Sequence, residues 1–463
     1  MNRIKIARSL QTFGRILKEG GFEAFLVGGA VRDSLLKKSC SDYDVATNAT
    51  PKQVMSLFKH VIPTGIAHGT VTVLFGGEKI EVTTFRTDSD YSDGRHPTNV
   101  SFASTVEEDL SRRDFTVNAI AASLENGLIC DPFNGRKDLQ NGIIRAVGSP
   151  RERFSEDGLR PIRAIRFASK LGFQIHPETL AEIPHCLDTV KKISIERFTD
   201  EFSKILLTKK PSEALFLMEE TGILQIFVPE LCRCKDCHQG GFHSFDVMTH
   251  LFYAVDGIAH FLQGSDVVED ERRNLALAAL FHDVGKPQCA EPSREDAGRQ
   301  TFYGHENLSR EMANTILTRL RFPNATVKRV CLLIENHMFS YEPCWSDAAV
   351  RRFLSRLNLN SNPGILNSLF DLRRADAFAL ENHPQTCKNL DAFEERIEQI
   401  LSQDGALSLK DLEVNGKDLI QMGITNGIKI GWTLNELLNT VLDSPEMNQK
   451  EKLLNLAKNL NNL

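Results

Sequence analysis

The pattern of hydrophobic and polar positions predicts strands in the first part of the chain. An apolar run at 24–27 ends at the glycine pair 28–29, which indicates a short strand followed by a turn. The runs 70–75 and 79–85 are rich in β-branched residues, which favour strands. The glycine pair 76–77 separates them, and two glycines between strand-like runs predict a hairpin. The first 135 residues therefore mix strand and helix patterns.

From Ser155 onward the strand pattern fades and helical periodicity replaces it. Two later segments, 232–242 and 286–301, have the composition of loops. We therefore expect an α+β protein, in which a small head with a mixed sheet precedes an elongated, all-helical region. The segments with the clearest helical spacing and charged outer faces are 157–170, 194–207, 211–220 and the chain after residue 390.

Length and composition indicate an ordinary globular protein. A chain of 463 residues is too long for one core, so about three domains are expected. No apolar run approaches the roughly 20 residues that span a bilayer, and residues 1–11 lack a secretory apolar core. Ten scattered cysteines suit a reducing cytosol, so we expect a cytoplasmic protein. The net charge of −6 argues against general coating of nucleic acid, although a local basic stripe can still bind RNA.

A cluster of three cysteines, Cys232, Cys234 and Cys237, is followed by His238 and has two interpretations. Three thiols and an imidazole can hold zinc. The spacing is tight, however, and no second CxxC pair accompanies the cluster, so we favour a solvent-exposed loop.

The residues after the first predicted strand have the chemistry of a nucleotide-binding site. Glycines between a strand and a helix let backbone N–H groups approach phosphate oxygens, and Arg32 in the next turn can hold the same phosphates. Asp42 and Asp44 point to one face of a strand and can hold two Mg²⁺ ions. Glu81, on a neighbouring predicted strand, is a third candidate carboxylate. A plain turn and a solvated strand end explain each part alone, but not their combination in this order.

The segment 156–166 carries a regular pattern of charged residues. Asp157, Arg160, Arg163 and Arg166 recur every three residues, so we expect a slowly drifting stripe along one side of a helix. An aspartate acceptor beside an arginine donor can imitate the edge of a base and so select cytosine or adenine. A salt-bridged surface helix is the competing interpretation. Pro161 inside the helix argues against it, because a surface helix gains nothing from a lost hydrogen bond.

Five motifs in this order resemble the bacterial tRNA nucleotidyltransferase and poly(A) polymerase family, and the match is closest to the class II CCA-adding enzymes. The resemblance implies a head related to polymerase β, and it covers about 175 residues. The motifs are GGAVRDSLLKKSCSDYDVAT (28–47), PTGIAHGTVTV (63–73), EVTTFRTDSDYSDGRHPTNVSF (81–102), RRDFTVNAIA (112–121) and SEDGLRPIRAIRFASKLGF (155–173).

The resemblance also implies residue roles. Asp42 and Asp44 would hold the catalytic Mg²⁺ ions, with Glu81 as a third catalytic carboxylate. Asp114 would accept a hydrogen bond from the ribose 2′-hydroxyl, which favours ribonucleotides. In this family Asp157 and Arg160 select the nucleotide. The nucleotide-binding set implied by the resemblance is Gly28, Gly29, Arg32, Arg113, Asp114, Asn118, Asp157, Arg160, Arg163 and Arg166.

Two segments bear on which nucleotides such an enzyme adds. Residues 91–97 match the family's flexible loop, which CC-adding enzymes tend to lack, so complete CCA or A-only addition is favoured. The poly(A) polymerase subgroup carries a basic-aromatic signature after the DxD strand, whereas this chain has HVIPTGIAHGTV at 60–71. The tRNA enzyme is therefore favoured, and A-only addition remains its rival.

The helical region resembles the HD metal-dependent phosphohydrolases. Their ligands follow the order His, His-Asp, His, His, Asp, and the complete set favours a working site rather than a scaffold. Mn²⁺, Ni²⁺, Co²⁺ or Fe would suit four imidazoles and two carboxylates. Mapped by motif, the ligands are His250, His282, Asp283, His305, His337 and Asp376. Lys286, one turn beyond the His-Asp pair, would neutralise a substrate phosphate.

These expectations combine into one hypothesis: addition or repair of the CCA end of tRNA from CTP and ATP, with tRNA as the partner, no obligatory protein partner and no membrane. The alternatives are A-only addition, a poly(A) polymerase, an HD phosphohydrolase whose head only docks RNA, and a non-catalytic RNA-binding scaffold. The expected domains are a head at 1–140, a helical neck at 141–231, an HD-type domain at 232–385 and a tRNA-binding tail at 386–463. Within this tail, residues 407–448 resemble the tail region of the same family.

Overall fold

The computed structural model describes residues 2–40, 42–66, 69–91, 97–240, 244–292, 300–339, 341–402 and 406–461. Contacts divide the chain into two compact units. The first contains Met1–Arg233 with Ile316–Phe322, and the second contains Cys234–Thr315 with Pro323–Leu463. Among the helices that the structure describes, none has the length and apolar character needed to cross a membrane.

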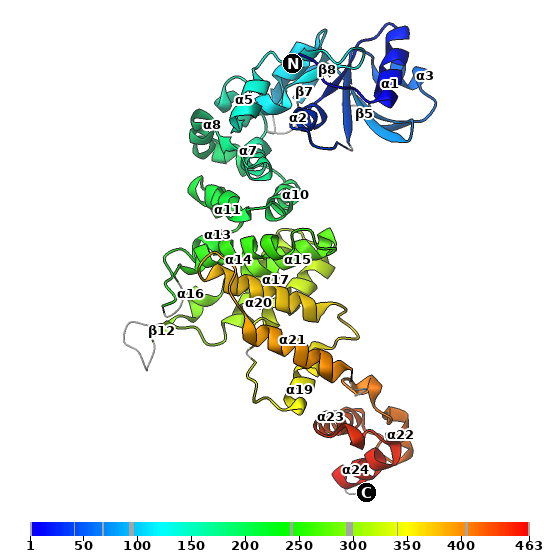
Figure 1. Cartoon of the computed structure of the whole chain (residues 1–463), viewed down its shortest axis with the longest axis vertical. Helices are drawn as coiled ribbons and strands as arrows, with labels where there is room; N and C mark the ends of the chain where they lie inside the picture. Colours follow the sequence, from blue (N-terminus) through cyan, green and yellow to red (C-terminus); the bar gives the residue numbers. More distant parts are fainter. Residues whose placement is uncertain are drawn as a thin grey trace. The chain divides into compact units, whose positions relative to one another are not determined.

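A mixed sheet of seven strands begins the first unit (Figure 1). The strands are β1 (Ala24–Val27), β2 (Tyr43–Thr47), β3 (Val61–Gly65), β4 (Thr70–Phe75), β5 (Glu78–Thr84), β8 (Ala121–Ser123) and β9 (Ile129–Cys130), with β6 (Arg86–Tyr91) and β7 (Pro97–Phe102) as a separate pair. The sheet order is β3-β4-β5-β2-β1-β8-β9. β2 and β5 run parallel, whereas the other neighbours run antiparallel. The expected mixed sheet is confirmed.

The predicted hairpin is present between β4 and β5. Gly76 and Gly77 both have positive φ angles, 60° and 84°, and Phe75 pairs with Glu78 across the turn. A two-residue turn with two positive φ angles matches the twist of antiparallel strands, and glycine adopts it without strain. The hairpin places Glu81 next to β2, because β5 continues from the turn as the parallel neighbour of that strand.

The remainder of the first unit is helical, as expected, apart from the short pair β10 (Ile143–Ile144) and β11 (Gln174–Ile175). Aromatic packing fixes the first helix, since Phe13 stacks on Phe58 with ring centroids 4.4 Å apart. The helices are α1 (Arg8–Glu19), α2 (Gly29–Leu35), α3 (Pro51–Leu57), α4 (Val106–Ser111), η2 (Thr116–Asn118), α5 (Gly135–Asn141), α6 (Pro150–Glu156), α7 (Leu159–Leu171), α8 (Pro177–Glu182), η3 (Ile183–Cys186), α9 (Leu187–Val190), α10 (Ile195–Leu206), α11 (Pro211–Glu220), α12 (Ile223–Phe227) and α13 (Pro229–Cys232).

The charged segment 156–166 differs from the expected continuous helix. Asp157 lies in a break between α6 and α7, with extended backbone angles of −146° and 112°. Pro161 is the third residue of α7, where a backbone N–H would have no partner within the helix. The proline therefore costs no intrahelical hydrogen bond, and the interpretation of Pro161 as a sign against a surface helix is wrong.

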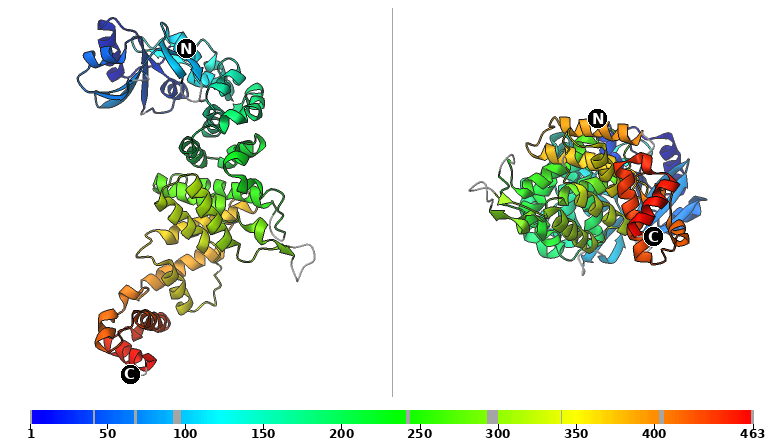
Figure 2. Two further views of the ribbon diagram at one scale, coloured as in Figure 1. Left: turned by 180° about the vertical axis from the view of Figure 1, so that it is seen from behind. Right: turned by 90° about the horizontal axis from the view of Figure 1, so that it is seen from below.

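The second unit is helical in both views of Figure 2, apart from the short pair β12 (Glu291–Pro292) and β13 (Gln300–Thr301). Residues 286–289 of the expected loop form a helical turn. The helices are α14 (Val247–Phe261), α15 (Glu269–Phe281), α16 (Lys286–Cys289), α17 (His305–Arg319, whose end belongs to the first unit), α18 (Asn324–Asn336), α19 (Asp347–Leu357), α20 (Ile365–Ala379), α21 (Lys388–Leu401), η4 (Leu409–Asp411), α22 (Gly416–Gln421), α23 (Gly427–Asp443), η5 (Pro445–Met447) and α24 (Lys450–Asn461).

The helices of the second unit pack around two separate groups of residues. Gly257 of α14 lets α20 approach closely, since a Cβ atom there would lie 2.9 Å from Cα of Ala375. The last helices have a core of their own, which includes Val414, Leu419 and Leu437. The C-terminal segment is thus packed around its own apolar residues, separately from the α14–α20 contact.

Candidate active site and metal centre

Three carboxylates gather on adjacent strands of the head. Asp44 of β2 pairs in register with Val27 of β1 on one side and with Glu81 of the parallel β5 on the other. Asp42 lies one residue before β2, so the expectation that both aspartates belong to the strand is correct only for Asp44. Asp42 and Glu81 are exposed to solvent.

The electrostatics of this group favour a bound cation. Desolvation raises the pKa of Asp44, the negative charges of Glu81 and Asp42 raise it further, and the positive charge of Arg113 opposes them. A divalent ion placed among the carboxylates would remove this repulsion. Oxygen donors of this kind are the ligands that Mg²⁺ prefers, usually with water or substrate phosphates completing the shell. The residues present therefore fit a divalent metal.

A glycine brings the carboxylates close to an arginine. Gly28 has a φ of 65°, and a Cβ atom there would lie 3.0 Å from Nη1 of Arg113 and 3.6 Å from Oδ2 of Asp44. The buried carboxylate of Asp109 accepts hydrogen bonds from Arg112 at 2.7 Å and Arg113 at 3.3 Å. Asp109 of α4 was missed in the sequence, although its spacing of three and four residues from the arginines that follow this helix is the signal that reveals such a pair.

A chain of hydrogen bonds connects the glycine-rich turn to the neck. Buried Arg32 donates to Asp33 at 2.8 Å and to Asn118 at 2.7 Å, and Asn118 donates to Asp114 at 3.1 Å. Arg163 of α7 donates to the other oxygen of Asp114 at 2.7 and 2.9 Å. Burial alone would raise the pKa of Asp114, but Arg163 and Asn118 outweigh it and lower the pKa. Asp114 is therefore an ionised acceptor, held rigidly on both sides.

The two residues expected to read the base have separate partners. Asp157 accepts hydrogen bonds from Arg197 of α10 at 2.7 and 3.1 Å. Arg160 pairs with Glu156 and donates to the backbone carbonyl of Arg112 at 3.1 Å. The sequence did not reveal Arg197, because nothing local joins it to an aspartate 40 residues earlier.

The other two arginines of the stripe contact one aromatic ring. Arg166 lies 4.0 Å and Arg163 5.2 Å from the ring centroid of Phe167, and Arg32 lies 5.3 Å from the same centroid. Arg166 also pairs with buried Glu201 of α10, a second residue missed in the sequence. These contacts are cation–π and ion-pair interactions that hold three arginines close together. Residues 92–96 of the expected flexible loop lie outside the described residues.

In the second unit, the six residues mapped by motif converge on one buried cluster. They come from helices or helix ends that are far apart in the sequence. The members are His250 of α14, His282 and Asp283 after α15, His305 at the start of α17, His337 after α18 and Asp376 of α20.

Asp283 lies between two sets of ligands. Its Oδ2 atom is 3.2 Å from Nε2 of His282 and 3.7 Å from Nε2 of His250. Its Oδ1 atom is 3.0 Å from Nε2 of His305 and 3.7 Å from Nε2 of His337. Within each set, the ligand atoms all lie within 4.8 Å of one another. Asp376 completes the cluster, 3.0 Å from Nε2 of His250.

Backbone carbonyls fix the orientation of three of these imidazoles. Nδ1 of His282, His305 and His337 lies 2.9, 2.7 and 2.6 Å from the carbonyl oxygen three residues earlier. A carbonyl only accepts, so Nδ1 of each ring carries a proton and Nε2 faces the cluster, where a neutral ring offers its lone pair to a metal. Nε2 of His305 and His337 and Oδ1 of Asp283 have no hydrogen bond of good geometry. Buried lone pairs that converge without donors fit a transition-metal centre.

Positive charges and histidines keep the cluster's carboxylates ionised. Burial alone would raise the pKa of Asp283 and Asp376, yet both pKa values lie well below the ordinary value. His282 and Lys286 are the main causes at Asp283, and hydrogen bonds from His250 and His282 are the main causes at Asp376. Burial lowers the pKa of His282, but Asp283 and Asp376 outweigh it and raise it to about 10.

The cysteine-containing loop is less exposed than expected. Cys234 is fully buried and contacts the carbonyl oxygen of Val284. Buried Gln239 accepts a hydrogen bond from Lys286 at 2.6 Å, so the loop packs beside the metal cluster. The prediction of a solvent-exposed loop is therefore wrong at these positions, because the loop closes over the segment that follows His282-Asp283. The metal-ligand groups found among the described residues do not include its cysteines.

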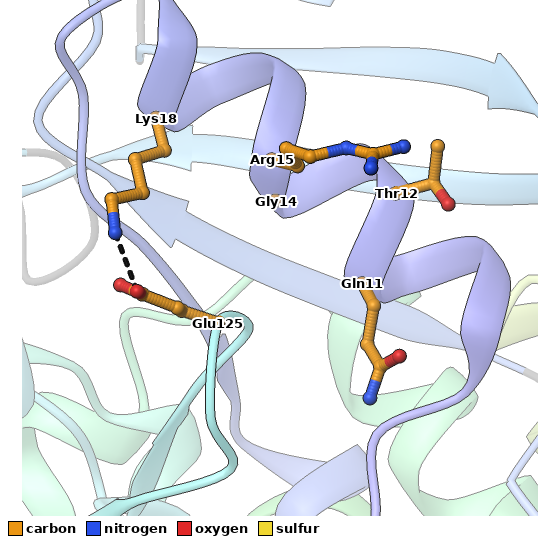
Figure 3. Close-up of a pocket in the computed structure, with 6 residues that line it drawn as sticks. All are labelled: Gln11, Thr12, Gly14, Arg15, Lys18 and Glu125. Carbon is orange, nitrogen blue, oxygen red and sulfur yellow. Dashed lines mark hydrogen bonds and ion pairs between the residues drawn. The ribbon is translucent and has the colours of Figure 1, made fainter.

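A pocket beside α1 lies apart from both sets of residues. It has a volume of about 410 Å³, and Lys18 and Glu125 form an ion pair at its edge (Figure 3). None of the motif residues named above is among those that line it. The motif residues, rather than this pocket, therefore define the candidate site of the head.

Three family models match successive parts of the chain. Residues 24–145 match the "Poly A polymerase head domain", and residues 172–235 match the "Probable RNA and SrmB- binding site of polymerase A". Residues 241–380 match the "HD domain". The nucleotidyltransferase head and the HD domain both imply the use of divalent metals, in agreement with the two clusters of ligands.

Curated relatives that match about half of the chain are named CCA-adding enzymes. The chain is 47% identical to that of Lactobacillus helveticus over 236 residues, which cover 51% of the chain and 58% of that enzyme. It is 47% identical to that of Bacillus subtilis over 211 residues, or 46% of the chain and 53% of that enzyme. The matched region thus spans little more than half the length of these relatives.

Solved structures extend the likeness over nearly the whole chain. The crystal structure of the Bacillus stearothermophilus CCA-adding enzyme in complex with CTP has a TM-score of 0.72 and 28% identity, and the alignment covers 98% of this chain and 97% of that one. The Thermotoga maritima CCA-adding enzyme complexed with tRNA shares the fold, with a TM-score of 0.60, 20% identity and coverage of 97% and 94%. Sequence motifs, domain models and fold agree: the chain is similar to CCA-adding enzymes, its first half matches the poly(A) polymerase head and RNA-binding models, and residues 241–380 match an HD domain.

Proposed function

We propose that this protein adds or repairs the 3′-terminal CCA of tRNA, using CTP and ATP as substrates. One observation carries the proposal: Gly28, Asp44 and Arg113 approach one another at the end of the parallel β2–β5 pair. Carboxylates for metal and an arginine for phosphate thus lie beside a turn that admits a triphosphate. The relatives named CCA-adding enzymes, including one solved with CTP, support this substrate class.

The chain's own residues have distinct tasks in this reaction. Mg²⁺ bound by Asp42, Asp44 and Glu81 would supply charge neutralisation and an activated 3′-hydroxyl. Arg113 and the turn at Gly28-Gly29 bind the triphosphate and stabilise the departing pyrophosphate. Arg32 orients the helix that starts at this turn, because its guanidinium is fixed by Asp33 and Asn118. Asp114 accepts the ribose 2′-hydroxyl.

Base selection falls to Asp157 and Arg160. Arg197 holds the Asp157 carboxylate in place, and Glu156 does the same for the Arg160 guanidinium. A base with the wrong donors and acceptors would leave these buried or half-buried groups unpaired. Arg163 and Arg166 complete the nucleotide-binding surface beside Phe167. The tRNA is bound by the helical remainder. The tail at 386–463, which packs around a core of its own, provides one contact surface.

The experiment uses tRNA transcripts that end before, within and after CCA, with CTP and ATP supplied separately and together. We expect addition of CC with CTP alone, and of CCA with both nucleotides. Addition of A only, and only to tRNA ending in CC, would establish the A-adding rival. Long A tails on unrelated RNA would establish a poly(A) polymerase. Absence of incorporation on every transcript would contradict a polymerase function altogether.

A second activity is favoured by the six converging ligands of the HD region. We propose that these residues would hold Mn²⁺, Ni²⁺, Co²⁺ or Fe, with Asp283 shared by the two sets of ligands. Such ions would supply an acidified water as nucleophile. Lys286 remains the candidate for neutralising a substrate phosphate at an RNA end. Hydrolysis of 2′,3′-cyclic nucleotides and bis-p-nitrophenyl phosphate is tested with each metal, and inactivity throughout would reduce this region to a scaffold.

A four-part organisation accompanies the proposed function: a head at 1–140, a neck at 141–231, an HD-type domain at 232–385 and a tail at 386–463. It is supported by the concentration of carboxylates and arginines in the first two parts and of histidines in the third. Limited proteolysis followed by mass spectrometry tests the boundaries. Residue 140 lies in α5 and the buried Leu231 in α13, so cleavage is expected in the nearest segments outside these helices, 148–149, 235–240 and 381–387. Cleavage well inside the proposed parts would redraw them.

A further inference from the structure

A second cavity in the HD region is separate from the metal cluster. It lies between α15, α18 and α20 and has a volume of about 830 Å³. None of the six metal ligands lines it. Val267, Leu275, Leu332 and Pro363 give it apolar walls. Its size lies within the range of small-molecule sites, which combine apolar walls with a few polar groups.

One side of the cavity is a complete hydrogen-bond network. Glu271 accepts from Arg329 at 2.6 and 2.9 Å and from Ser368 at 2.6 Å. Its second oxygen accepts from Nδ2 of Asn274 at 3.0 Å. Three of these hydrogen bonds end on Oε1 of Glu271, so this oxygen has no capacity left for a ligand. The network instead fixes the geometry of α15 against α18 and α20.

Two acceptors next to this network have no donor. Asn274 is 9% exposed, and its Oδ1 atom has no hydrogen-bond partner. Its amide orientation is set, because the opposite orientation would place Oδ1 against Glu271. Within the described part of the chain, no hydrogen bond or ion pair reaches the carboxylate of Asp371. Both residues line the cavity, one turn beyond Glu271 on α15 and one turn beyond Ser368 on α20.

The unmatched atoms identify the kind of ligand. Both are acceptors, and one carries a negative charge, so a ligand must supply several donors and a positive charge. The apolar walls suit a methylene chain. Two of the other charged side chains at the cavity have partners of their own: Arg329 is bound by Glu271, and Arg273 is bound by Asp270 at 2.7 Å. Exposed Lys328 lies where the cavity meets a neighbouring groove.

We infer that this cavity binds an alkylammonium compound of the polyamine class, with Asp371 and Asn274 as acceptors for the ammonium group. The electrostatics of Asp371 agree with this role. Burial, together with the negative charges of Glu394 and Glu271, raises its pKa to about 6, against the effect of Arg374. A bound ammonium group would offset the repulsion between Asp371 and these two glutamates. The inference does not depend on the proposed nucleotidyl transfer or on the metal cluster.

The test is calorimetric titration of the full-length protein with spermidine and with 1,5-diaminopentane. We expect one saturable site per chain and at least a tenfold increase in Kd for Asp371→Asn, which keeps the shape and removes the charge. The matched control is Glu451→Gln, which removes one negative charge from the same unit at an exposed position of α24 outside the cavity. This control should bind like the parent protein, and 1,5-pentanediol should not bind.

Equal affinity in Asp371→Asn and the parent protein would overturn the inference. So would a loss of equal size in Glu451→Gln, or displacement of the amine by millimolar Mg²⁺, because either result indicates general attraction to an acidic protein. Absence of saturable binding to the folded parent protein would overturn it as well. Thermal unfolding of Asp371→Asn checks its fold, and Asn274→Leu supplies an independent variant that should also weaken binding.

Discussion

The candidate sites of the head and of the HD region both gather carboxylates, but in opposite surroundings. In the head, Asp42, Asp44 and Glu81 all keep contact with solvent, and desolvation together with the charges of Glu81 and Asp42 raises the pKa of Asp44. In the HD region, Asp283 is buried among histidines and Lys286, and its pKa is well below the ordinary value. One group of acids lies open to solvent, whereas the other lies in a buried cluster of imidazoles beside a lysine.

The difference teaches how each site is suited to its metal. An open set of carboxylates leaves coordination positions for water and for substrate phosphates, as magnesium sites commonly do. A buried set of four imidazoles and two carboxylates provides most of a coordination shell from the protein itself. We therefore expect the head to bind metal weakly and together with a nucleotide, and the HD region to retain metal through purification.

The largest effect is expected at the head. Asp44→Asn should reduce incorporation of CTP and ATP into tRNA by at least about 10³-fold, because it removes charge where the transition state accumulates it. Incorporation of labelled nucleotide measures this, and tRNA binding should be unchanged. Asp188→Asn, an exposed charge in the same unit, is the control. Substantial activity in the Asp44 variant would place the catalytic carboxylates elsewhere.

The next effect concerns retained metal. His282→Ala with Asp283→Ala should lose the tightly bound metal and any phosphodiester hydrolysis while CCA addition persists, because the two sites use different ligands. Elemental analysis measures the bound metal, and separate assays measure phosphodiester hydrolysis and CCA addition. If the double variant fails to fold, His305→Gln replaces it. Loss of CCA addition in a folded variant would show that the two regions do not act separately.

A smaller effect is expected for nucleotide choice. Arg197→Met removes the partner that holds Asp157, so the preference for C and A over U and G should fall by about 1–3 kcal/mol, while addition continues. Single-nucleotide competition on tRNA lacking CCA measures the preference. Lys192→Met, outside the Asp157 contacts, is the control. An unchanged preference would mean that Arg197 only stabilises the neck, which urea unfolding would then detect.

The smallest effect is expected on the free energy of unfolding, at a partly buried carboxylate that has no hydrogen-bond partner among the described residues. Asp371 has a pKa raised to about 6, so its ionisation opposes folding. The folded state binds this proton more tightly than the unfolded state, so stability falls as pH rises from about 4 through 6. Asp371→Asn should therefore raise the free energy of unfolding by about 1–2 kcal/mol at pH 8 and by little at pH 4. Denaturant unfolding at both pH values tests this, and a destabilised variant at pH 8 would contradict it.

The sequence by itself determined the local elements and the chemistry they carry. The run 24–27 followed by Gly28-Gly29 forms β1 and the start of α2, and Gly76-Gly77 forms the hairpin turn. These features follow from backbone sterics and side-chain alternation over a few neighbouring residues, so they can be read locally. The order of the HD ligands was readable for the same reason, since each motif is short and chemically distinctive.

Only the tertiary structure decided which charged residues meet. Asp157 contacts Arg197, Asp114 contacts Arg163, and Cys234 is buried under the residues beyond Asp283. An arginine carries no local mark of its partner, because ion pairs between distant residues depend on how helices pack. Asp42 fell just outside β2 for a similar reason: strand ends are set by pairing with neighbours rather than by the strand's own residues.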